Sequence, residues 1–298
     1  MNITEYIRQW ADRIEATMAK LLPGEDVEPP VIHRAMRYSS LGGGKRLRGI
    51  LAVSACRAAG GREETALPLA AALEMIHAYS LVHDDLPCMD DDDMRRGKPA
   101  NHKVFGEAMA VLAGDALLTR GFWVLGRLPE LTGVAGETAL AILREVSEAA
   151  GTSGLIGGQV LDVEAEGRAA ILAVEHLEGI HRRKTGALFR ASVLSGALLG
   201  GAPAEKLQPF AAYAEALGLL FQIVDDILDV VGDARAMGKG VGRDRRRDKA
   251  TYPALLGLDG AQEMARREAE RALEAARELG AQGDVLGALV EYVHRRDR

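Results

Sequence analysis

The chain has 298 residues, of which 48% are hydrophobic and 27% charged, and its formal net charge is −6. This composition suits one large soluble domain, or two small ones, with ample core, and the acidic balance argues against nucleic acid as a partner. Two cysteines, Cys56 and Cys88, are too few for a disulfide framework or a zinc site. The N-terminal segment is charged throughout and no apolar run approaches the roughly 18 to 20 residues that span a bilayer, so we expect a cytoplasmic protein without a membrane span.

Apolar residues recur at helical spacing along almost the whole chain. The pattern is clearest in 66–83, 108–128, 186–200 and 211–231, and Gly and Pro separate such segments. Alternating strand patterns are essentially absent. With no composition shift that would mark a linker and no repeat of fixed period, the sequence predicts an all-α helical bundle that forms a single domain over 1–298.

The first polar motif along the chain is LGGGKRLRG at 41–49, in which three glycines precede Lys45, Arg46 and Arg48. A Gly-rich turn before a basic helix start can offer backbone amides and cations to a phosphate group. The same pattern is also common in ordinary turns, and GxxxxGK[ST], the P-loop signature, is absent. Both interpretations of the segment, an anion site and a simple turn, stay open.

The stretch 81–102 places six aspartates within ten positions. Carboxylates a few ångströms apart repel by roughly 1 kcal/mol in water and several times more in a dry cleft. Asp84 and Asp85 end an apolar helical pattern, Pro87 discourages its continuation, and Asp90 follows the turn. An acidic turn that caps a helix would explain such a run if it stood alone, whereas a bound cation would explain it if a partner cluster exists.

A second acidic cluster lies in FQIVDDILD, about 140 residues further along, where Asp225, Asp226 and Asp229 interrupt a strongly apolar helical pattern. Their spacing keeps all three within about 100° of arc on one helix face. The flanking residues are apolar and leave little polar surface that would solvate these charges. Two trios of carboxylates therefore favour a shared positive guest, and Mg²⁺ fits because it takes a few carboxylates together with substrate phosphates.

Taken together, these motifs resemble those of one protein family. The sequences GGGKRLR, DDLPCMDDDDMRRGKP, GGQVLD, KTGAL, FQIVDDILD and GK…D…KATYP occur in the order and at the spacings of the trans-isoprenyl diphosphate synthases, the polyprenyl synthetase family, and especially of its bacterial farnesyl diphosphate synthases. The resemblance covers nearly the whole chain. It implies a helical bundle around a central cavity, in which roughly three Mg²⁺ ions, with Mn²⁺ as an alternative, bridge two aspartate clusters to an allylic diphosphate.

The resemblance also implies roles for individual residues. The implied metal ligands, some acting through water, are Asp84, Asp85, Asp90, Asp225, Asp226 and Asp229. The implied diphosphate contacts are Arg95, Lys184 and Lys239 for the allylic substrate and Lys45, Arg48, His77 and Arg96 for isopentenyl diphosphate, with Lys249 as a further substrate contact. Thr185 and Gln222 would supply oxygens beside a developing carbocation, although polar residues so placed could equally be helix-packing hydrogen bonds.

Two residues bear on the length of the product that the resemblance implies. Tyr79 and Ser80 precede Asp84 by five and four residues, which on a helix places them about 6 to 8 Å below the first aspartate. An aromatic side chain at this position resembles the chain-length stop of fifteen-carbon synthases. We therefore expect farnesyl diphosphate, formed from isopentenyl diphosphate and dimethylallyl or geranyl diphosphate, as the main product.

Several alternatives remain. The nearest is a geranylgeranyl diphosphate synthase with the same sites and a deeper pocket. A terpene cyclase is disfavoured because its second metal motif mixes Asn, Ser/Thr and Glu, unlike DDILD. A non-catalytic subunit of a heteromeric prenyl synthase would tend to lose aspartates or lysines, which are intact here. Family members are usually homodimers, so we expect this chain to dimerise.

The chain departs from the family pattern in one loop. Asp248 stands before the lysine of KATYP, where many relatives have Gly, and the segment 242–248 is unusually rich in arginine. This departure leaves the role of Lys249 open. Two interpretations of this loop stay open, a solvated segment and a lid over the substrate. The same two stay open for the basic tail at 294–298.

Overall fold

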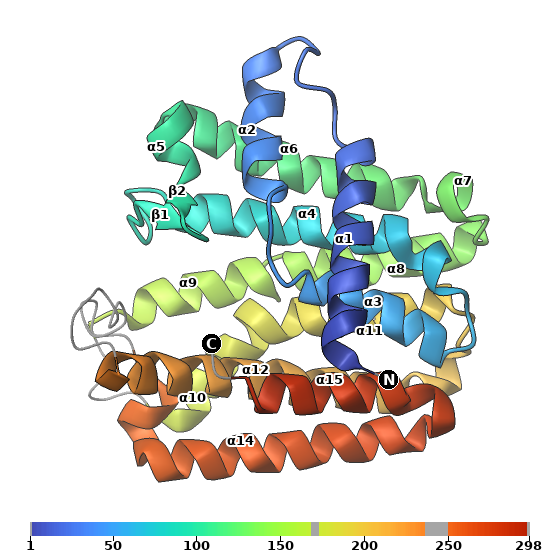
Figure 1. Cartoon of the computed structure of the whole chain (residues 1–298), viewed down its shortest axis with the longest axis vertical. Helices are drawn as coiled ribbons and strands as arrows, with labels where there is room; N and C mark the ends of the chain where they lie inside the picture. The colour runs from blue at the N-terminus through green and yellow to red at the C-terminus, as the bar shows by residue number, and fades with distance from the viewer. Residues whose placement is uncertain (1, 168–172, 236–249, 297–298) are drawn as a thin grey trace.

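Helices dominate the computed structural model, which describes residues 2–167, 173–235 and 250–296 (Figure 1). The all-α prediction is therefore confirmed. The α-helices are α1 (Ile3–Leu21), α2 (Pro30–Ser40), α3 (Leu47–Ala58), α4 (Leu67–Asp84), α5 (Asn101–Phe105), α6 (Glu107–Gly126), α7 (Leu128–Thr132), α8 (Gly136–Ala150), α9 (Leu155–Ala165), α10 (Val174–His181), α11 (Ala187–Leu199), α12 (Gln208–Arg235), α14 (Tyr252–Glu278) and α15 (Asp284–His294). Short 3₁₀ turns lie at Glu63–Ala66, Ala204–Lys206 and Gly280–Gly283, and a π-helical turn, η3, spans Arg182–Gly186.

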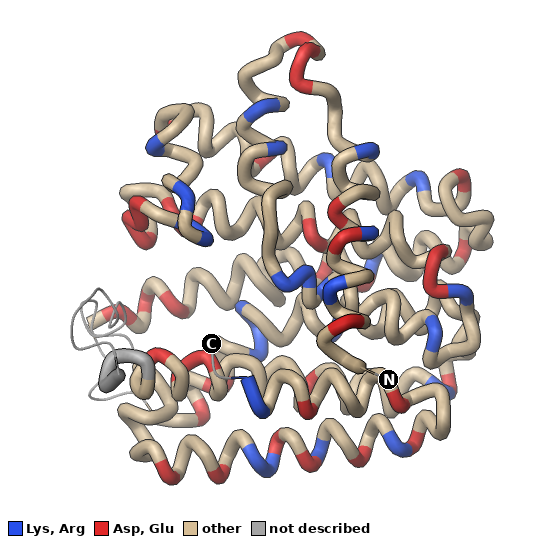
Figure 2. The backbone as a smooth tube through the Cα atoms, in the orientation of Figure 1, with Lys and Arg blue, Asp and Glu red and all other residues tan. Residues whose placement is uncertain are grey.

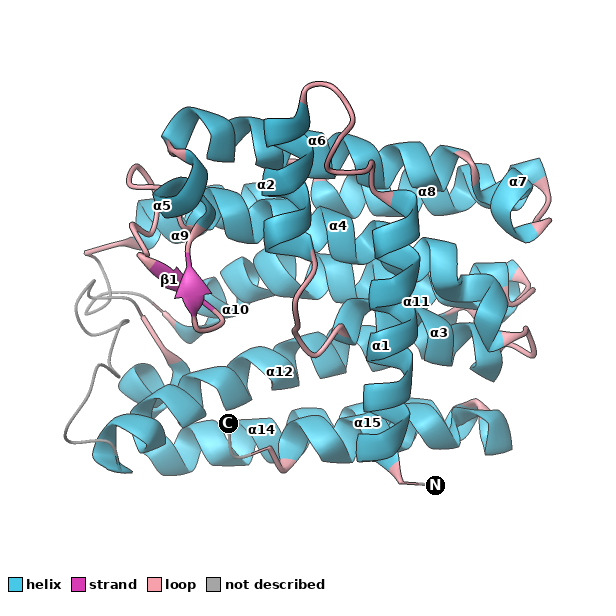
Figure 3. Ribbon diagram, turned by 45° about the horizontal axis from the view of Figure 1, so that its top comes forward, coloured by secondary structure: helices cyan, strands magenta, loops and turns pink. Residues whose placement is uncertain are grey.

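A two-stranded hairpin is the one β-element among the described residues. Strand β1 (Met94–Arg95) pairs antiparallel with β2 (Lys98–Pro99). The sequence did not predict it, because two residues per strand are too few to show an alternating pattern. The hairpin follows the first acidic cluster directly and lies beside α5 (Figure 3).

Helix α4 forms the centre of the bundle because apolar residues cover almost its whole circumference. All residues from 69 to 76 are buried, as are residues 49–56 of α3 and 191–197 of α11. Helix α3 packs against both α4 and α11. Buried apolar residues from α1 through α15 join these three helices in one hydrophobic cluster.

The outer helices bring the two acidic clusters to the same end of the bundle. Helix α6 packs along α4, while α12 packs along α11 and α14. The C-terminal ends of α4, α9 and α12 lie at one end of the molecule in both views (Figures 1 and 3). Acidic residues of all three helices gather there, and basic residues lie between the clusters (Figure 2).

Two helical segments, Glu63–Asp84 and Glu107–Gly126, are long and apolar enough to cross a membrane by length and composition. The sequence expectation that no apolar segment approaches this length was therefore wrong. Within the first segment 67% of the most apolar window is buried inside the bundle, as in the core helix of a soluble protein. Helix α6 buries 39% of its window, and its outer face exposes Val111, Leu112 and Trp123.

Candidate active site

The first acidic cluster is held by the end of α4 and the turn that follows it. The backbone N–H of Asp90 donates to the carbonyl oxygen of Asp84 at 2.7 Å, so the turn folds back onto the helix end. Asp85 is only 2% exposed and accepts hydrogen bonds from the Arg95 guanidinium, with Nε at 2.9 Å from Oδ1. Burial raises the pKa of Asp85, and Arg95 opposes that shift. Arg95, which the resemblance assigns to the allylic diphosphate, is thus engaged by Asp85 in this structure.

The second cluster lies on α12, as the sequence predicts, and its three carboxylates differ in environment. Asp226 is 6% exposed and accepts a hydrogen bond from the Tyr252 backbone N–H at 3.0 Å, which ties α12 to the start of α14. Asp225 pairs with Arg296 at 2.5 Å. Packing around the Asp225 carboxyl group raises its pKa, and Arg296 counteracts this. Asp229 is half-buried.

The six aspartates therefore fall into two kinds. Asp85 and Asp226 are buried and hydrogen-bonded to protein, whereas Asp84, Asp90, Asp225 and Asp229 are half-buried. Neither predicted trio brings three ligand oxygens within 4.8 Å of one another among the described residues. This open spacing suits Mg²⁺, which keeps several waters and shares its shell with phosphate oxygens.

Between the clusters, α3, α4 and the hairpin contribute a basic group made of Arg48, His77 and Arg96. Burial lowers the pKa of Arg48, yet its guanidinium stays charged at neutral pH and lies 5.2 Å from the Phe189 ring centroid. Burial, reinforced first by Arg48 and Arg96, holds the pKa of His77 well below its ordinary value. His77 is therefore neutral here and not one of a ring of cations.

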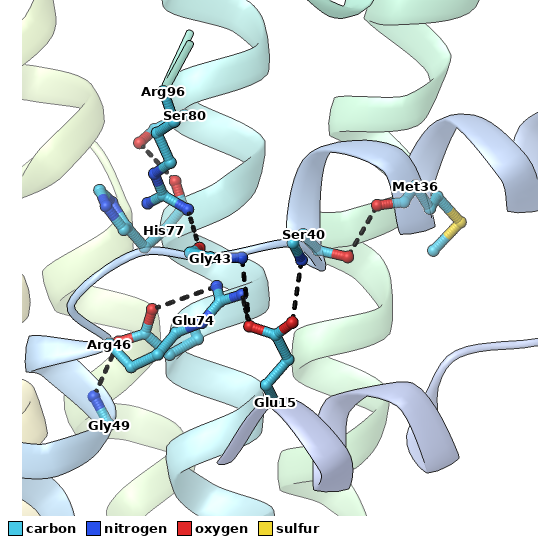
Figure 4. Close-up of polar contacts among 11 residues, drawn as sticks. Glu15, Met36, Ser40, Gly43, Arg46, Gly49, Glu74, His77, Ser80 and Arg96 are labelled. Carbon is cyan, nitrogen blue, oxygen red and sulfur yellow. Dashed lines mark hydrogen bonds and ion pairs between the residues drawn. The ribbon is translucent and has the colours of Figure 1, made fainter. Parts of the chain in front are cut away.

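The glycine-rich loop is bound by an acidic residue from α1. The N–H groups of Gly42 and Gly43 donate to the Glu15 carboxylate at 3.0 and 3.3 Å, and Arg46 donates to the same carboxylate at 2.7 Å (Figure 4). Arg96 in turn donates to the carbonyl oxygen of Gly43 at 2.7 Å. The amides of this loop are thus used inside the protein, which favours the interpretation as a structural turn. Lys45 is exposed beyond it.

Lys184 is positioned by an interruption in a long helix. The π-helical turn η3 joins α10 to α11 and carries both Lys184 and Thr185. Lys184 Nζ donates to Asp162 Oδ2 on α9 at 2.6 Å, and the Thr185 hydroxyl donates to Gln222 Oε1 on α12 at 2.9 Å. A β-carbon on Gly158 would lie 2.2 Å from the backbone nitrogen of Lys184, so only glycine permits α9 to approach this turn.

Two residues of this region carried no individual assignment in the sequence analysis. Asp162 closes the GGQVLD motif, and that motif was the signal that could have identified it. Arg296 lay in the basic tail of open role, yet its side chain is 5% exposed. It donates to the Phe221 carbonyl oxygen at 2.7 Å and lies 4.1 Å from the Phe221 ring centroid. A C-terminal cation therefore balances the second acidic cluster in this structure.

A cavity of about 350 Å³ begins at Asp84 and extends along α4 toward α9. Tyr79 and Ser80 line it, together with Cys88 and Leu155. Tyr79 is 6% exposed and packs edge-to-face on His83, with ring centroids 5.8 Å apart. Burial raises the pKa of Tyr79 to about 12, so the ring stays neutral. The structure thus places both residues in the wall of a mostly apolar cavity next to the first cluster.

Lys239, Lys249 and the arginine-rich segment 242–248 lie outside the described residues. Their predicted roles remain predictions. Of the basic tail, the described part ends at Arg296.

Comparison with known proteins identifies the class. The structure matches the crystal structure of an FPP/GFPP synthase from Zymomonas mobilis with a TM-score of 0.88 and 35% identity, covering 98% of this chain and 99% of that one. The fold is therefore that of the isoprenyl diphosphate synthases.

Sequence comparison gives the family. A family model described as polyprenyl synthetase matches residues 29–291, and the chain belongs to this family. It is 43% identical to the farnesyl diphosphate synthase of Geobacillus stearothermophilus over 298 residues, covering 100% of this chain and 99% of that protein. It is 49% identical to the chloroplastic geranylgeranyl pyrophosphate synthase of Catharanthus roseus over 271 residues, covering 91% of this chain and 75% of that protein.

Proposed function

We propose that this protein is a prenyltransferase that condenses isopentenyl diphosphate with dimethylallyl or geranyl diphosphate to give farnesyl diphosphate. The observation that carries the proposal is the meeting of two acidic clusters at one end of a helical bundle, with basic residues between them and an apolar cavity beside them. Such a site can hold two diphosphates and an apolar tail. Its charged groups are carboxylates and cations, which suits a reaction that begins by loss of a diphosphate leaving group.

The residues divide the work as follows. Lys184 and Arg95 would bind the allylic diphosphate, exchanging their present contacts with Asp162 and Asp85 for phosphate oxygens. Lys45, Arg48, His77 and Arg96 would hold isopentenyl diphosphate. The Thr185 hydroxyl and Gln222 would present oxygens to the allylic carbocation, which the alkene of isopentenyl diphosphate attacks. Fixed cations that stabilise the leaving group supply most of the rate enhancement, and exclusion of water protects the carbocation.

Magnesium is the proposed cofactor. Four half-buried carboxylates would be the hard oxygen donors to the metal: Asp84, Asp90, Asp225 and Asp229. The buried Asp85 and Asp226 would hold the two clusters in position through their hydrogen bonds to protein. When bound, Mg²⁺ would supply positive charge to the departing diphosphate. Roughly three ions per site, and replacement by Mn²⁺, are part of this proposal.

Tyr79 is proposed to set the product length. Tyr79→Ala should shift the main product from fifteen carbons to twenty or more, because the truncation extends the cavity away from Asp84 while leaving the acidic clusters unchanged. The first condensation should keep a near-normal rate. Chromatography of the dephosphorylated products measures the shift. The half-buried Tyr292 offers a control, since Tyr292→Ala lies outside this cavity. A mutant that still stops at fifteen carbons would move the length-determining wall elsewhere.

A twenty-carbon product is the competing proposal. It is supported by the 49% identity to a geranylgeranyl pyrophosphate synthase, which exceeds the 43% identity to the Geobacillus enzyme. The proposal of farnesyl diphosphate rests on the aromatic wall at Tyr79 and on bacterial relatives of matching length. Wild-type protein that makes mainly the twenty-carbon alcohol after dephosphorylation would decide for the alternative.

The two diphosphate sites should separate kinetically. Arg48→Ala should raise the KM for isopentenyl diphosphate by about tenfold or more, because Arg48 lies beside His77 and Arg96 in the group proposed to bind this substrate. Lys184→Ala should instead impair use of the allylic substrate. Steady-state kinetics with each substrate varied in turn measures both effects, and Arg57→Ala, an exposed change on the same helix as Arg48, is the control. Equal effects of both variants on both substrates would refute the assignment while leaving the reaction itself intact.

The function is tested by supplying the purified chain with Mg²⁺, isopentenyl diphosphate and a short allylic diphosphate. We expect a longer prenyl diphosphate and release of inorganic diphosphate. A folded, metal-replete sample that consumes neither substrate would support the remaining alternative, a non-catalytic subunit of a heteromeric synthase.

We further propose a cytoplasmic homodimer in which 1–298 is a single domain. Helix α6 exposes Leu112 by 52% and Val111 by 41%, an apolar face that a twofold mate would cover. Leu112→Asp should therefore yield monomers, whereas Leu256→Asp, also at an exposed leucine, should not. Sedimentation at micromolar concentration measures this. Wild-type protein that sediments as a monomer would contradict the dimer.

A further inference from the structure

A second metal-binding group lies next to the first acidic cluster and is made of residues that the proposed reaction does not use. Asp91, Asp93 and His102 each offer one ligand atom, and these atoms all lie within 4.8 Å of one another. Among the described residues this is the one such group of three. Asp91 and Asp93 are exposed, so the two carboxylates alone would indicate no more than a solvated acidic turn.

His102 is the feature that distinguishes this group from an ordinary acidic turn. His102 is only 6% exposed, and both of its ring nitrogens are buried without a hydrogen-bond partner. A buried polar atom without a partner costs about 1 to 3 kcal/mol, so native structures rarely leave one unsatisfied. One nitrogen of this ring lies within 4.8 Å of a carboxylate oxygen of Asp91 and of Asp93, and those two oxygens lie equally close to each other. A cation between these three atoms would satisfy the nitrogen.

The backbone fixes these residues relative to one another. The Ala100 N–H donates to the Asp93 carbonyl oxygen at 2.8 Å, which holds the start of α5 against the acidic turn. The neighbouring Asn101 side chain is buried and donates to the Ala35 carbonyl oxygen at 2.9 Å, which anchors α5 on α2. The imidazole is therefore held in place before any ion arrives, and only exposed carboxylates need to adjust.

We propose that Asp91, Asp93 and His102 form a binding site for a divalent transition metal, with Zn²⁺ as the probe of choice, separate from the proposed Mg²⁺ site. One imidazole nitrogen and two carboxylate oxygens form a mixed donor set that suits Zn²⁺ or Mn²⁺, whereas Mg²⁺ prefers oxygen ligands alone. Three protein ligands leave a further position for water. The site goes beyond the proposed prenyl transfer and does not depend on it.

Lys103 supplies a positive charge next to these carboxylates in the metal-free protein. Its Nζ lies 2.7 Å from Asp93 Oδ1, and its side chain is 43% exposed. Metal binding would displace the ammonium group into solvent, at little cost because the pair is exposed. The bound ion would connect the turn that carries Asp90 to α5, and so would fix the hairpin that presents Arg95.

The test is a calorimetric titration of chelator-stripped protein with Zn²⁺ in excess Mg²⁺ and without substrate. We expect one Zn²⁺ per chain with micromolar or tighter affinity. Asp91→Asn and His102→Gln should each weaken binding by at least about tenfold, because each removes a proposed ligand and loss of an outer-shell partner alone already costs about that much. Glu107→Gln, an exposed carboxylate nearby, and Asp84→Asn, in the proposed Mg²⁺ site, should leave the affinity unchanged.

Each outcome decides the proposal. Asp91 is exposed, so Asp91→Asn tests the site even if the buried His102 variant folds poorly. Absence of Zn²⁺ binding by the wild type, equal weakening by Glu107→Gln, or loss of binding in Asp84→Asn with none in Asp91→Asn would overturn it. Since no diphosphate is present, inactivity of the enzyme would not affect this result.

Discussion

Asp84→Ala should lower turnover by at least about a hundredfold. Asp84 ends α4 at the mouth of the apolar cavity, where its carboxylate faces the position proposed for the metal-bound leaving group. Stability should not fall, because the substitution removes a charge from an acidic cluster. Turnover under saturating substrate and the free energy of unfolding in denaturant measure the two effects. Asp12→Ala, an exposed carboxylate on α1, is the control for generic charge loss.

Asp225→Ala should lower turnover equally but should differ in stability. The Arg296 side chain is 5% exposed and relies on Asp225 as its carboxylate partner, so the variant leaves a buried guanidinium without it. The free energy of unfolding should fall by about 1 to 3 kcal/mol. Asp225→Ala combined with Arg296→Ala should restore much of that stability without restoring turnover. Near-normal turnover of either aspartate variant would contradict a metal-binding role for its cluster and favour a solvated acidic cap instead.

Gly158→Ala should also reduce turnover by more than about a hundredfold, although Gly158 contacts no substrate in the proposed mechanism. The added β-carbon would lie 2.2 Å from the backbone nitrogen and 2.6 Å from the Cα of Lys184, so η3 must shift. Overpacking of this kind costs about 1 to 3 kcal/mol of stability. The lost activity should appear first in the use of the allylic substrate, since Lys184 is displaced from Asp162.

Gly126→Ala is the matched control, because a β-carbon there meets no atom within 4 Å. A folded Gly158→Ala protein with wild-type kinetics for both substrates would show that the close approach of α9 does not position Lys184.

Local patterns in the sequence carried much of the fold. Helical periodicity predicted α4 and α12, and the Asp84–Asp85 pair with Pro87 predicted where α4 ends. The face shared by Asp225, Asp226 and Asp229 follows from helix geometry alone. These features depend on residues within a few positions of each other, which is the range over which a sequence can be interpreted without its tertiary contacts.

The remaining features depend on contacts between distant segments. No local pattern shows that Glu15 would occupy the amides of Gly42 and Gly43, or that Arg296 would reach Asp225 across 71 residues. The neutral state of His77 likewise results from burial beside arginines of two distant segments, 46–48 and 95–96. Sequence motifs indicated which residues to expect at the site, but their protonation states and internal partners required the packed structure.

The π-helical turn has a consequence for the tolerated length of the chain. Each hydrogen bond in such a turn closes over five residues instead of four, so η3 holds one residue more than an α-helical turn would. Deleting a single residue there would allow α10 to continue smoothly into α11, but the wider turn that carries Lys184 and Thr185 would be lost. Lys184 would then no longer face α9 while Phe189 stays in the core. The extra residue lets Lys184 face α9 while Phe189 packs in the core. The number of residues in this turn is therefore more constrained than the identity of its exposed members, Arg182 and Arg183.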